Sequence, residues 1–181
     1  CYDTTMGLTP LDGLMMGTRS GAIDPSILQY VAQESGESLE DITNDLNKKS
    51  GLLGVCGAAD CRDVEAKVQE DDDLAKLAIK MYADRIAKYI ANYYIELEGK
   101  VDSIVFTAGV LENGSEMRKE VLDRLSCLGV TINDDMNNKI ASFKDIHEGL
   151  ISGTDSKITV MVLPTNEEIM IVKDTFELVL K

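Results

Sequence analysis

The sequence is poor in the residues that build metal and redox centres. It has one histidine, no tryptophan and three prolines among 181 residues. Its four cysteines follow no zinc-binding or redox spacing, and the single histidine is too few for a mixed cysteine and histidine site. Four cysteines in a chain of this size do not form a disulfide scaffold, so we expect free thiols and a cytoplasmic protein.

Basic residues are also scarce. Lysine and arginine total 18 against 32 aspartates and glutamates, which gives a formal net charge of −14. Nucleic acids and anionic membranes attract basic surfaces, so this charge argues against both as partners. The longest apolar runs, such as residues 158–163, are far shorter than the roughly 20 residues of a membrane helix. No signal peptide is visible, and we expect neither a nucleic-acid nor a membrane partner.

What remains is the composition of a globular protein. Hydrophobic residues make up 44% and charged residues 28% of the chain, and the length suits a single domain over residues 1–181. The first residue is Cys1 and not methionine, so we expect a processed chain or a piece of a longer protein.

The residue pattern predicts helices first and alternating strands and helices later. Pro25 suits a first helical position, and Ser38 with Asp41 resembles a capping box. We predict helices over residues 25–34, 38–50, 71–98, 115–125 and 166–178, strands within 1–21 and over 103–107, 130–133 and 157–163, and loops over 51–57 and 108–114.

The longest predicted helix carries a stripe of mostly apolar residues at helical spacing. Such a stripe indicates a core face or an oligomer face, and not a cofactor site. Its members are Leu74, Leu77, Ala78, Met81, Tyr82, Arg85, Tyr89 and Tyr93.

Strands of β-branched residues that alternate with helices predict an α/β fold whose sheet has parallel members. In such sheets, ligands bind beyond the carboxyl ends of the strands. The sequence therefore indicates three loops as candidate ligand sites, namely residues 16–21, 108–114 and 164–168.

Two of these loops follow predicted strands. Backbone N–H groups in residues 108–114 suit a phosphate or a nucleoside, although the glycine there is equally consistent with a turn. Glu167 and Glu168 suit a Mg²⁺ ion that is shared with phosphate oxygens. The same pair also suits the first turn of a helix that Thr165 or Asn166 caps.

Two arginines are candidates for anion binding. Arg19 lies between Gly17 and Gly21, and a guanidinium held in this way offers fixed bidentate donors. The alternative is an ordinary exposed arginine. Arg62 follows a glycine-rich segment, and its alternative is an ion-paired residue at a helix start.

Taken together, these segments resemble the acetate kinase family. Residues 3–25, DTTMGLTPLDGLMMGTRSGAIDP, are similar to the long and specific family signature. Four shorter segments follow in the family's order and at about its spacings: GLLG at 51–54, DCRD at 60–63, FTAG and EN within 106–113, and PTNEE at 164–168. The resemblance covers essentially the whole chain.

The resemblance implies a fold and an activity. Acetate kinases transfer phosphate reversibly between ATP and acetate, which gives ADP and acetyl phosphate. They have the fold of the actin-like ATPase and sugar kinase superfamily, a ribonuclease-H-like mixed sheet flanked by helices. The resemblance is to the C-terminal domain alone, which binds nucleotide and forms a homodimer. The family's N-terminal domain, with its acyl-binding residues and catalytic aspartate, has no counterpart here, so we expect the isolated chain to be inactive.

The resemblance also implies roles for individual residues. Arg19 stabilises the transferring phosphoryl group, and Glu167 belongs to the site for Mg²⁺ or Mn²⁺. Asp60, Cys61 and Arg62 contact the nucleotide, and the adenosine loop consists of Gly109, Val110, Leu111, Glu112 and Asn113.

One residue of the adenosine loop departs from the family pattern. The adenosine loop usually has the form G-x-G-E-N, whereas Leu111 stands here at the second glycine. A leucine costs about 1 kcal/mol or more where the backbone needs a positive φ. The Leu111 side chain then either projects toward the nucleoside or folds back into the domain. We expect it to project and to weaken nucleoside binding.

Two alternatives remain open at this stage. The residues that set acyl chain length lie largely in the missing domain, so a propionate or butyrate kinase fits the sequence as well. A non-catalytic dimerisation module is the alternative from another class of function.

Overall fold

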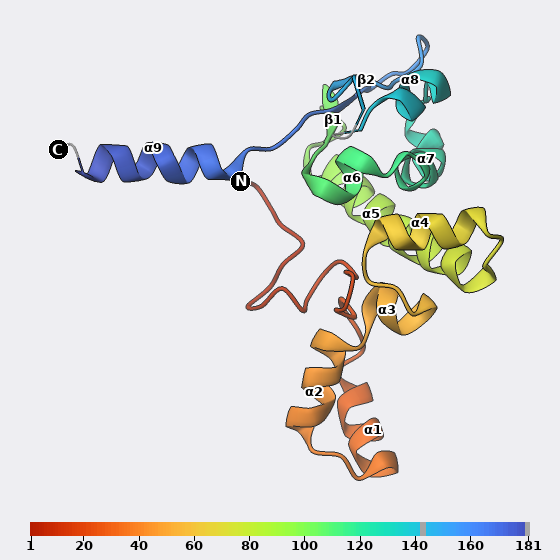
Figure 1. Cartoon of the computed structure of the whole chain (residues 1–181), viewed down its shortest axis with the longest axis vertical. Coiled ribbons are helices and arrows are strands. Elements are labelled where there is room, and N and C mark those ends of the chain that lie inside the picture. The colour runs from red at the N-terminus through yellow and green to blue at the C-terminus, as the bar shows by residue number, and fades with distance from the viewer. Residues whose placement is uncertain (142–143, 180–181) are drawn as a thin grey trace.

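A computed structural model describes residues 1–141 and 144–179 of the chain (Figure 1). Five helices precede the first strand, four lie between β1 and β2, and one follows β3 among the described residues. The helices are α1 (Ser26–Ser35), α2 (Leu39–Lys48), α3 (Gly51–Cys56), α4 (Cys61–Gln69), α5 (Asp73–Glu96), α6 (Ala108–Asn113), α7 (Ser115–Arg124), the 3-10 helix η1 (Ser126–Leu128), α8 (Asp134–Lys139) and α9 (Glu167–Val179).

The described strands form one small mixed sheet in the order β1-β3-β2. The central strand β3 (Thr159–Val162) pairs in parallel with β1 (Ser103–Phe106), with Phe106 opposite Val162. It pairs in antiparallel orientation with the two-residue strand β2 (Gly149–Leu150). The predicted α/β fold with parallel members is therefore confirmed. Because β1 and β3 run in the same direction, their carboxyl ends lie at the same edge of the sheet.

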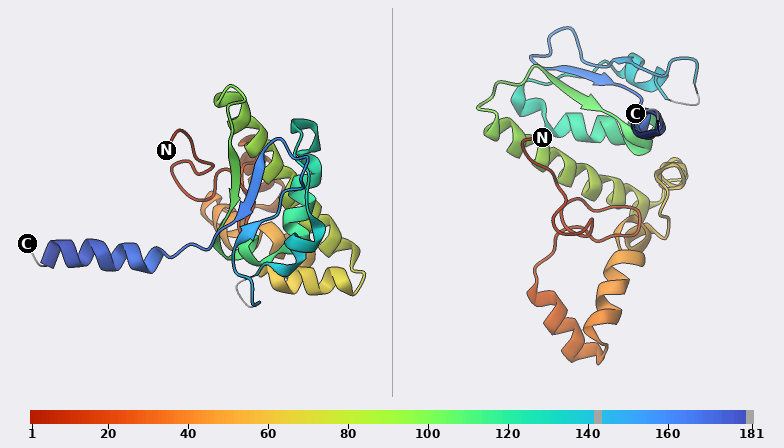
Figure 2. Two further views of the ribbon diagram at one scale, coloured as in Figure 1. Left: turned by 90° about the horizontal axis from the view of Figure 1, so that it is seen from above. Right: turned by 90° about the vertical axis from the view of Figure 1, so that its left-hand side faces the viewer.

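Helices cover one face of the sheet. Figure 2 shows α7 and then α5 beneath the strands, with α3 and α4 beyond α5. The core at this interface contains Phe106, Val121 and Val160, each at most 2% exposed. The opposite face is open at β1, where Val105 is 44% exposed, so β1 is buried on one side only.

Two parts of the chain extend away from this body (Figure 1). The α1–α2 hairpin projects to one side, and α1 has no buried residue. The last helix, α9, projects to another side, and every described residue of it is exposed, including Ile171 and Phe176. In the described ranges, no helix combines the length and the apolar composition needed to cross a membrane.

The cap chemistry predicts several helix ends. The Ser38 hydroxyl accepts a hydrogen bond from the Asp41 backbone amide at 3.1 Å, as a capping box requires. Asp72 caps the longest helix, and Asn166 accepts a hydrogen bond from the Ile169 amide at 3.0 Å at the start of α9. The four cysteines are free thiols, as expected.

Other local predictions are wrong. The two glycine-containing segments expected as loops are the short helices α3 and α6. Residues 1–21 contain no strand, and within 130–133 only Ile132 forms an isolated bridge, to Ser152. On α5, the interpretation as a core or oligomer face is not contradicted, because Ala78 of the stripe is buried, whereas Leu74, Leu77 and Met81 are exposed and stay candidates for an oligomer face.

Candidate functional site

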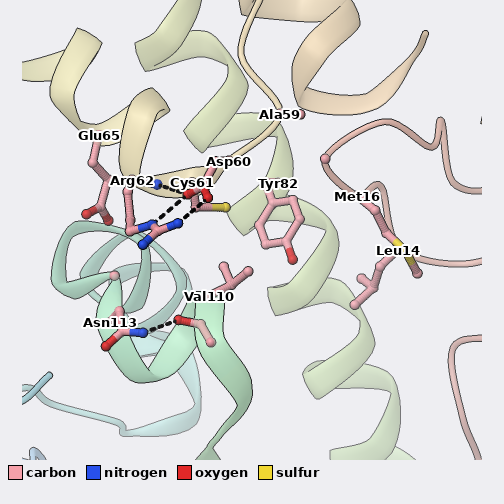
Figure 3. Close-up of a pocket in the computed structure, with 13 residues that line it drawn as sticks. Leu14, Met16, Ala59, Asp60, Cys61, Arg62, Glu65, Tyr82, Val110 and Asn113 are labelled. Atoms are coloured by element: carbon pink, nitrogen blue, oxygen red, sulfur yellow. Dashed lines mark hydrogen bonds and ion pairs between the residues drawn. The ribbon is translucent and has the colours of Figure 1, made fainter. Parts of the chain in front are cut away.

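A cavity of about 640 Å³ lies between α4, α5, α6 and the N-terminal segment 14–17 (Figure 3). We name it the α4–α6 cavity. This volume is in the usual range for small-molecule sites. Its walls come from four parts of the chain that lie up to about 100 positions apart in sequence. They are Leu14, Met16, Gly17, Ala59, Asp60, Cys61, Arg62, Glu65, Tyr82, Gly109, Val110, Asn113 and Gly114.

Asp60 and Arg62 form the polar edge of the cavity at the start of α4. The Arg62 guanidinium donates to both carboxylate oxygens of Asp60, at 3.0 and 2.6 Å. Asp60 also caps α4, since it accepts a hydrogen bond from the Arg62 backbone amide at 2.9 Å. These hydrogen bonds from the side chain and backbone of Arg62 lower the pKa of Asp60 to about 2. The pair is exposed, and it holds a guanidinium in a fixed orientation at the cavity mouth.

The inner wall is less polar. Burial first, and then the nearby carboxylates of Glu65 and Asp60, raise the pKa of the Cys61 thiol to about 11. Burial likewise raises the pKa of Tyr82 to about 12. Both groups are therefore neutral near pH 7 and present a largely apolar surface. A thiol with so high a pKa is a poor nucleophile, so we assign Cys61 no covalent role.

Glu65 places a carboxylate in the α4 wall of the cavity. Among the described side chains, its Oε1 is a buried oxygen without a hydrogen-bond partner. Burial raises the pKa of Glu65, while a hydrogen bond from the Met117 backbone lowers it. Gly114 makes room for this carboxylate, because a Cβ there would lie 2.9 Å from Oε1 and 2.8 Å from the Val110 carbonyl oxygen.

The helix α6 supplies the wall opposite α4. The Asn113 side chain donates to the Gly109 carbonyl at 2.9 Å, and this hydrogen bond connects the last residue of α6 to its first turn. Around Gly109 there is open space, with no atom within 4 Å of a Cβ built there. The backbone of α6 therefore faces the cavity with little side-chain cover at its first turn.

The N-terminal segment forms the remaining wall. A Cβ at Gly17 would lie 2.5 Å from the Ala59 carbonyl oxygen, so glycine permits this close approach. Arg19 lies two residues further on and is half-buried, with its Nη1 3.6 Å from the Met16 sulfur. It does not line the cavity itself, and it forms no ion pair with a carboxylate of the described residues. Its charge is therefore available to an anion next to the cavity.

A family model described as "Acetokinase family" matches residues 1–173 of the chain. The chain belongs to the acetokinase family. Acetate kinases of Finegoldia magna and Carboxydothermus hydrogenoformans are 49% and 51% identical to it, and each alignment covers 98% of this chain. The chain spans only 44% and 43% of the length of these two relatives.

Solved structures give the same family. A propionate kinase from Francisella tularensis superposes with a TM-score of 0.87 at 47% sequence identity, over 95% of this chain and 42% of that protein. An acetate kinase from Porphyromonas gingivalis also gives 0.87, at 39% identity, over 97% of this chain and 43% of that protein. These neighbours agree with the predicted actin-like ATPase type of fold.

The expectation that the Leu111 side chain projects toward the nucleoside is wrong. Leu111 is inside the helix α6, and it is not among the non-glycine residues with positive φ. Its side chain packs against the hydrophobic core and does not line the cavity. The reason is that Ala108, with a φ of 62°, provides the left-handed turn that starts α6, so position 111 needs no glycine.

Glu112 also lies elsewhere than expected for a nucleotide contact. It is only 9% exposed and does not line the cavity. Its Oε1 accepts hydrogen bonds from the Thr165 backbone amide at 2.9 Å and from the Thr165 hydroxyl at 3.3 Å. The carboxylate therefore points into the protein, toward the segment that follows β3.

Arg118 supports α6 from the protein interior, and no sequence pattern indicates this role. It is fully buried, and its guanidinium donates to the carbonyl oxygens of Leu111 and Glu112, both at 2.8 Å. It also donates to Asn137 and to the Ile140 carbonyl at 2.7 and 3.0 Å. Burial lowers the pKa of Arg118 to about 10, so it keeps its charge near pH 7. Its position on a helix with a polar sequence predicts only an exposed residue.

The Mg²⁺ ion expected from the family resemblance needs few protein ligands, because phosphate oxygens of the nucleotide also bind it. Among the described residues, no group of three or more histidine, cysteine, aspartate or glutamate side chains is placed to hold a metal. Kinases bind Mg²⁺ through one or two carboxylates together with phosphate oxygens. Glu167 is exposed in the first turn of α9, five residues after the end of β3, and its carboxylate fits that use.

The predicted site residues therefore divide into two sets. Those that line the α4–α6 cavity are Asp60, Cys61, Arg62, Gly109, Val110 and Asn113, whereas Arg19, Leu111, Glu112 and Glu167 do not line it. Tyr82 and Glu65 were not predicted. Tyr82 belongs to the helical stripe on α5, which was interpreted as a core or oligomer face and not as part of a site. No sequence pattern indicated Glu65.

Proposed function

We propose that the chain is the nucleotide-binding part of an acetate kinase, which transfers phosphate reversibly between ATP and acetate. The observation that carries this proposal is the α4–α6 cavity. It brings together residues of the DCRD segment and Gly109 of the FTAG segment, which are 47 to 49 positions apart in sequence, on facing walls. A longer polypeptide would supply the acyl site, because the chain spans less than half of its relatives.

The cavity suits a nucleotide in two ways. The neutral wall of Cys61, Tyr82 and Val110 offers an apolar surface to a base, and the backbone of α6 lies close enough to meet the ribose. The guanidinium of Arg62 remains at the mouth, where it can donate to phosphate oxygens. We assign ATP and ADP to this cavity as substrate and product.

Arg19 is the residue we assign to the transferred group. In the reaction, an acetate oxygen attacks the γ-phosphorus of ATP, the bond to the bridging oxygen of ADP breaks, and acetyl phosphate forms. Negative charge spreads over the equatorial oxygens of the phosphoryl group, and a fixed guanidinium stabilises it. The position of Arg19 beside the cavity, with no ion pair to a described carboxylate, supports this role. Mg²⁺ or Mn²⁺, held by Glu167, would supply charge neutralisation of the phosphates.

The experiment is made on the full-length protein that contains this sequence. Acetyl phosphate is trapped as its hydroxamate during incubation with ATP, acetate and Mg²⁺. We expect activity in the wild type and a fall in kcat of about 10² to 10³ in Arg19→Ala, the scale of one lost transition-state donor. Arg124→Ala is the control, since Arg124 pairs with Glu120 on α7. A kcat near wild type in Arg19→Ala would refute the assignment.

Propionate kinase is the second candidate, because a protein of that name superposes on 95% of the chain. The residues that distinguish acyl groups are expected in the rest of the polypeptide. Comparison of kcat/KM for acetate, propionate and butyrate in the full-length protein decides between them. A preference for propionate would replace acetate in the proposal and leave the nucleotide site unchanged.

A homodimer through this part of the chain belongs to the same proposal. Leu74, Leu77 and Met81 expose apolar surface along one face of α5, which is the kind of surface that a second copy covers. We expect a dimer at tens of micromolar by sedimentation. A strict monomer would contradict this assignment. A dimer that binds no nucleotide would favour the dimerisation module over the kinase.

A further inference from the structure

One buried carboxylate oxygen joins three segments next to the α4–α6 cavity. Oε1 of Glu112, on α6, accepts hydrogen bonds from the Thr165 amide at 2.9 Å, the Thr165 hydroxyl at 3.3 Å and the Thr107 hydroxyl at 3.5 Å. Thr107 directly follows β1, and Thr165 lies three residues after β3. Glu112 therefore links the exits of both parallel strands to the helix that forms a wall of the cavity.

Among the described residues, the hydrogen bonds of Thr165 to Glu112 are the last that tie the chain to another segment before α9. The sheet pairing ends where the Leu163 amide donates to the Phe106 carbonyl at 2.9 Å. Pro164 follows and has no amide hydrogen, so the next residue that can be held through its backbone is Thr165. Glu167 stands two residues further on, at the start of a helix whose described residues are all exposed.

We propose that Glu112 is a positioning residue that holds Thr165, and with it Glu167 and the base of α9, against the nucleotide wall α6. This inference rests on the proposed function for the meaning of Glu167, but the contact itself is independent of it. A buried carboxylate with several donors is costly to replace, because its removal leaves the Thr165 amide without its partner. In this role, Glu112 sets where Glu167 meets the phosphates and does not touch the nucleotide.

The first arm of the test measures the contact in the chain without ligand. Amide hydrogen exchange at Thr165 is compared among wild type, Glu112→Ala, Glu112→Asp and Glu112→Gln. We expect exchange to be about tenfold faster in the alanine and aspartate variants, the scale of one hydrogen bond to a charged group. Glutamine keeps an acceptor oxygen of the same reach, so we expect it to stay within about threefold of wild type. Unchanged exchange in the alanine and aspartate variants would overturn the proposal.

The second arm tests the placement of Glu167 in the full-length protein through the Mg²⁺ requirement of the reaction. We expect the Mg²⁺ concentration for half-maximal rate to rise about tenfold in Glu112→Ala and Glu112→Asp, the scale of one lost hydrogen bond to a charged group. The KM for ATP at saturating Mg²⁺ should stay within about twofold to threefold. Glu148→Ala, at an exposed glutamate before β2, is the matched control and should leave both values within about twofold, as surface substitutions do.

The outcomes separate the possibilities. Faster exchange with an unchanged Mg²⁺ requirement means that the contact only stabilises the fold, and it overturns the positioning role. A raised KM for ATP in both the alanine and the glutamine variant means that Glu112 binds nucleotide directly, and it also overturns the proposal. If the wild-type full-length protein shows no kinase activity, the proposed function fails, and the exchange arm alone decides whether Glu112 holds Thr165.

Discussion

Asp60 holds Arg62 by three hydrogen bonds, two from the guanidinium at 3.0 and 2.6 Å and one from the backbone amide at 2.9 Å. One carboxylate thus caps α4 and orients the arginine that faces the α4–α6 cavity. The alternative that the sequence left open, an ion-paired helix start, is what the structure shows. The two descriptions are compatible, because the pairing fixes the guanidinium where a phosphate can reach it.

The pKa of Asp60 provides the first prediction. Its folded-state pKa is lowered to about 2, below the value of about 3.9 for a free aspartate. Its contribution to stability is therefore complete above about pH 4 and is lost as the pH falls through about 2. An NMR titration of the Asp60 carboxyl should give a value near 2 in the wild type. In Arg62→Ala it should rise toward 3.9, and an unchanged value would contradict the assigned cause.

Leu111 provides the second prediction. Its side chain packs on the core, so Leu111→Ala should destabilise the fold by about 1–2 kcal/mol, less than a fully buried leucine. Nucleotide affinity should change by less than about threefold, because the residue does not line the cavity. Denaturant unfolding and calorimetry measure the two effects. Tighter nucleotide binding in the variant would restore the family-based expectation that Leu111 obstructs the site.

Arg118 provides the third prediction. Arg118→Leu leaves the carbonyl oxygens of Leu111, Glu112 and Ile140 without the donor they have now, in a buried position. We expect a loss of about 3 kcal/mol or more, since each such group costs about 1–3 kcal/mol. Arg124→Ala, which removes a surface ion pair, should cost less than about 1 kcal/mol. Similar costs for the two variants, measured by denaturant unfolding, would show that the buried guanidinium has no special role.

The isolated chain provides the fourth prediction. We expect no hydroxamate-trapped acetyl phosphate above a control without protein. Positioning of both substrates supplies most of the catalysis in phosphoryl transfer, and this chain is expected to hold only one of them. Activity of a pure 181-residue chain would show that the acyl site lies within it.

Local chemistry made several elements predictable from the sequence. Ser38 and Asp72 have side chains that satisfy the free amides of a helix start, so α2 and α5 begin near where the pattern places them. The apolar, β-branched segment at 157–163 gave the central strand of the sheet. The Arg62 segment and the α6 segment were both predicted to contact the nucleotide. That shared prediction came from the family resemblance and not from a pattern within either segment.

Non-local contacts explain the misses. Gly51 and Gly109 suggested loops, yet α3 is stabilised by burial of Leu52 and α6 by Arg118, which lies on the next helix. Glu112 looked like a ligand contact because a charged residue near a glycine usually faces solvent or an anion. Its partner Thr165 is 53 positions away, and no pattern within either segment reveals that pairing.

The binding of MgADP to the α4–α6 cavity tests the central claim most directly. Isothermal calorimetry compares wild type with Gly109→Phe, whose ring enters the open space next to Gly109, and with Thr154→Phe on the exposed turn between β2 and β3. The account predicts saturable binding with one site in wild type and in Thr154→Phe, and a loss of about tenfold or more in Gly109→Phe, since a filled cavity forfeits most ligand contacts. Equal affinity in all three proteins, or no binding in a folded wild type, would contradict it.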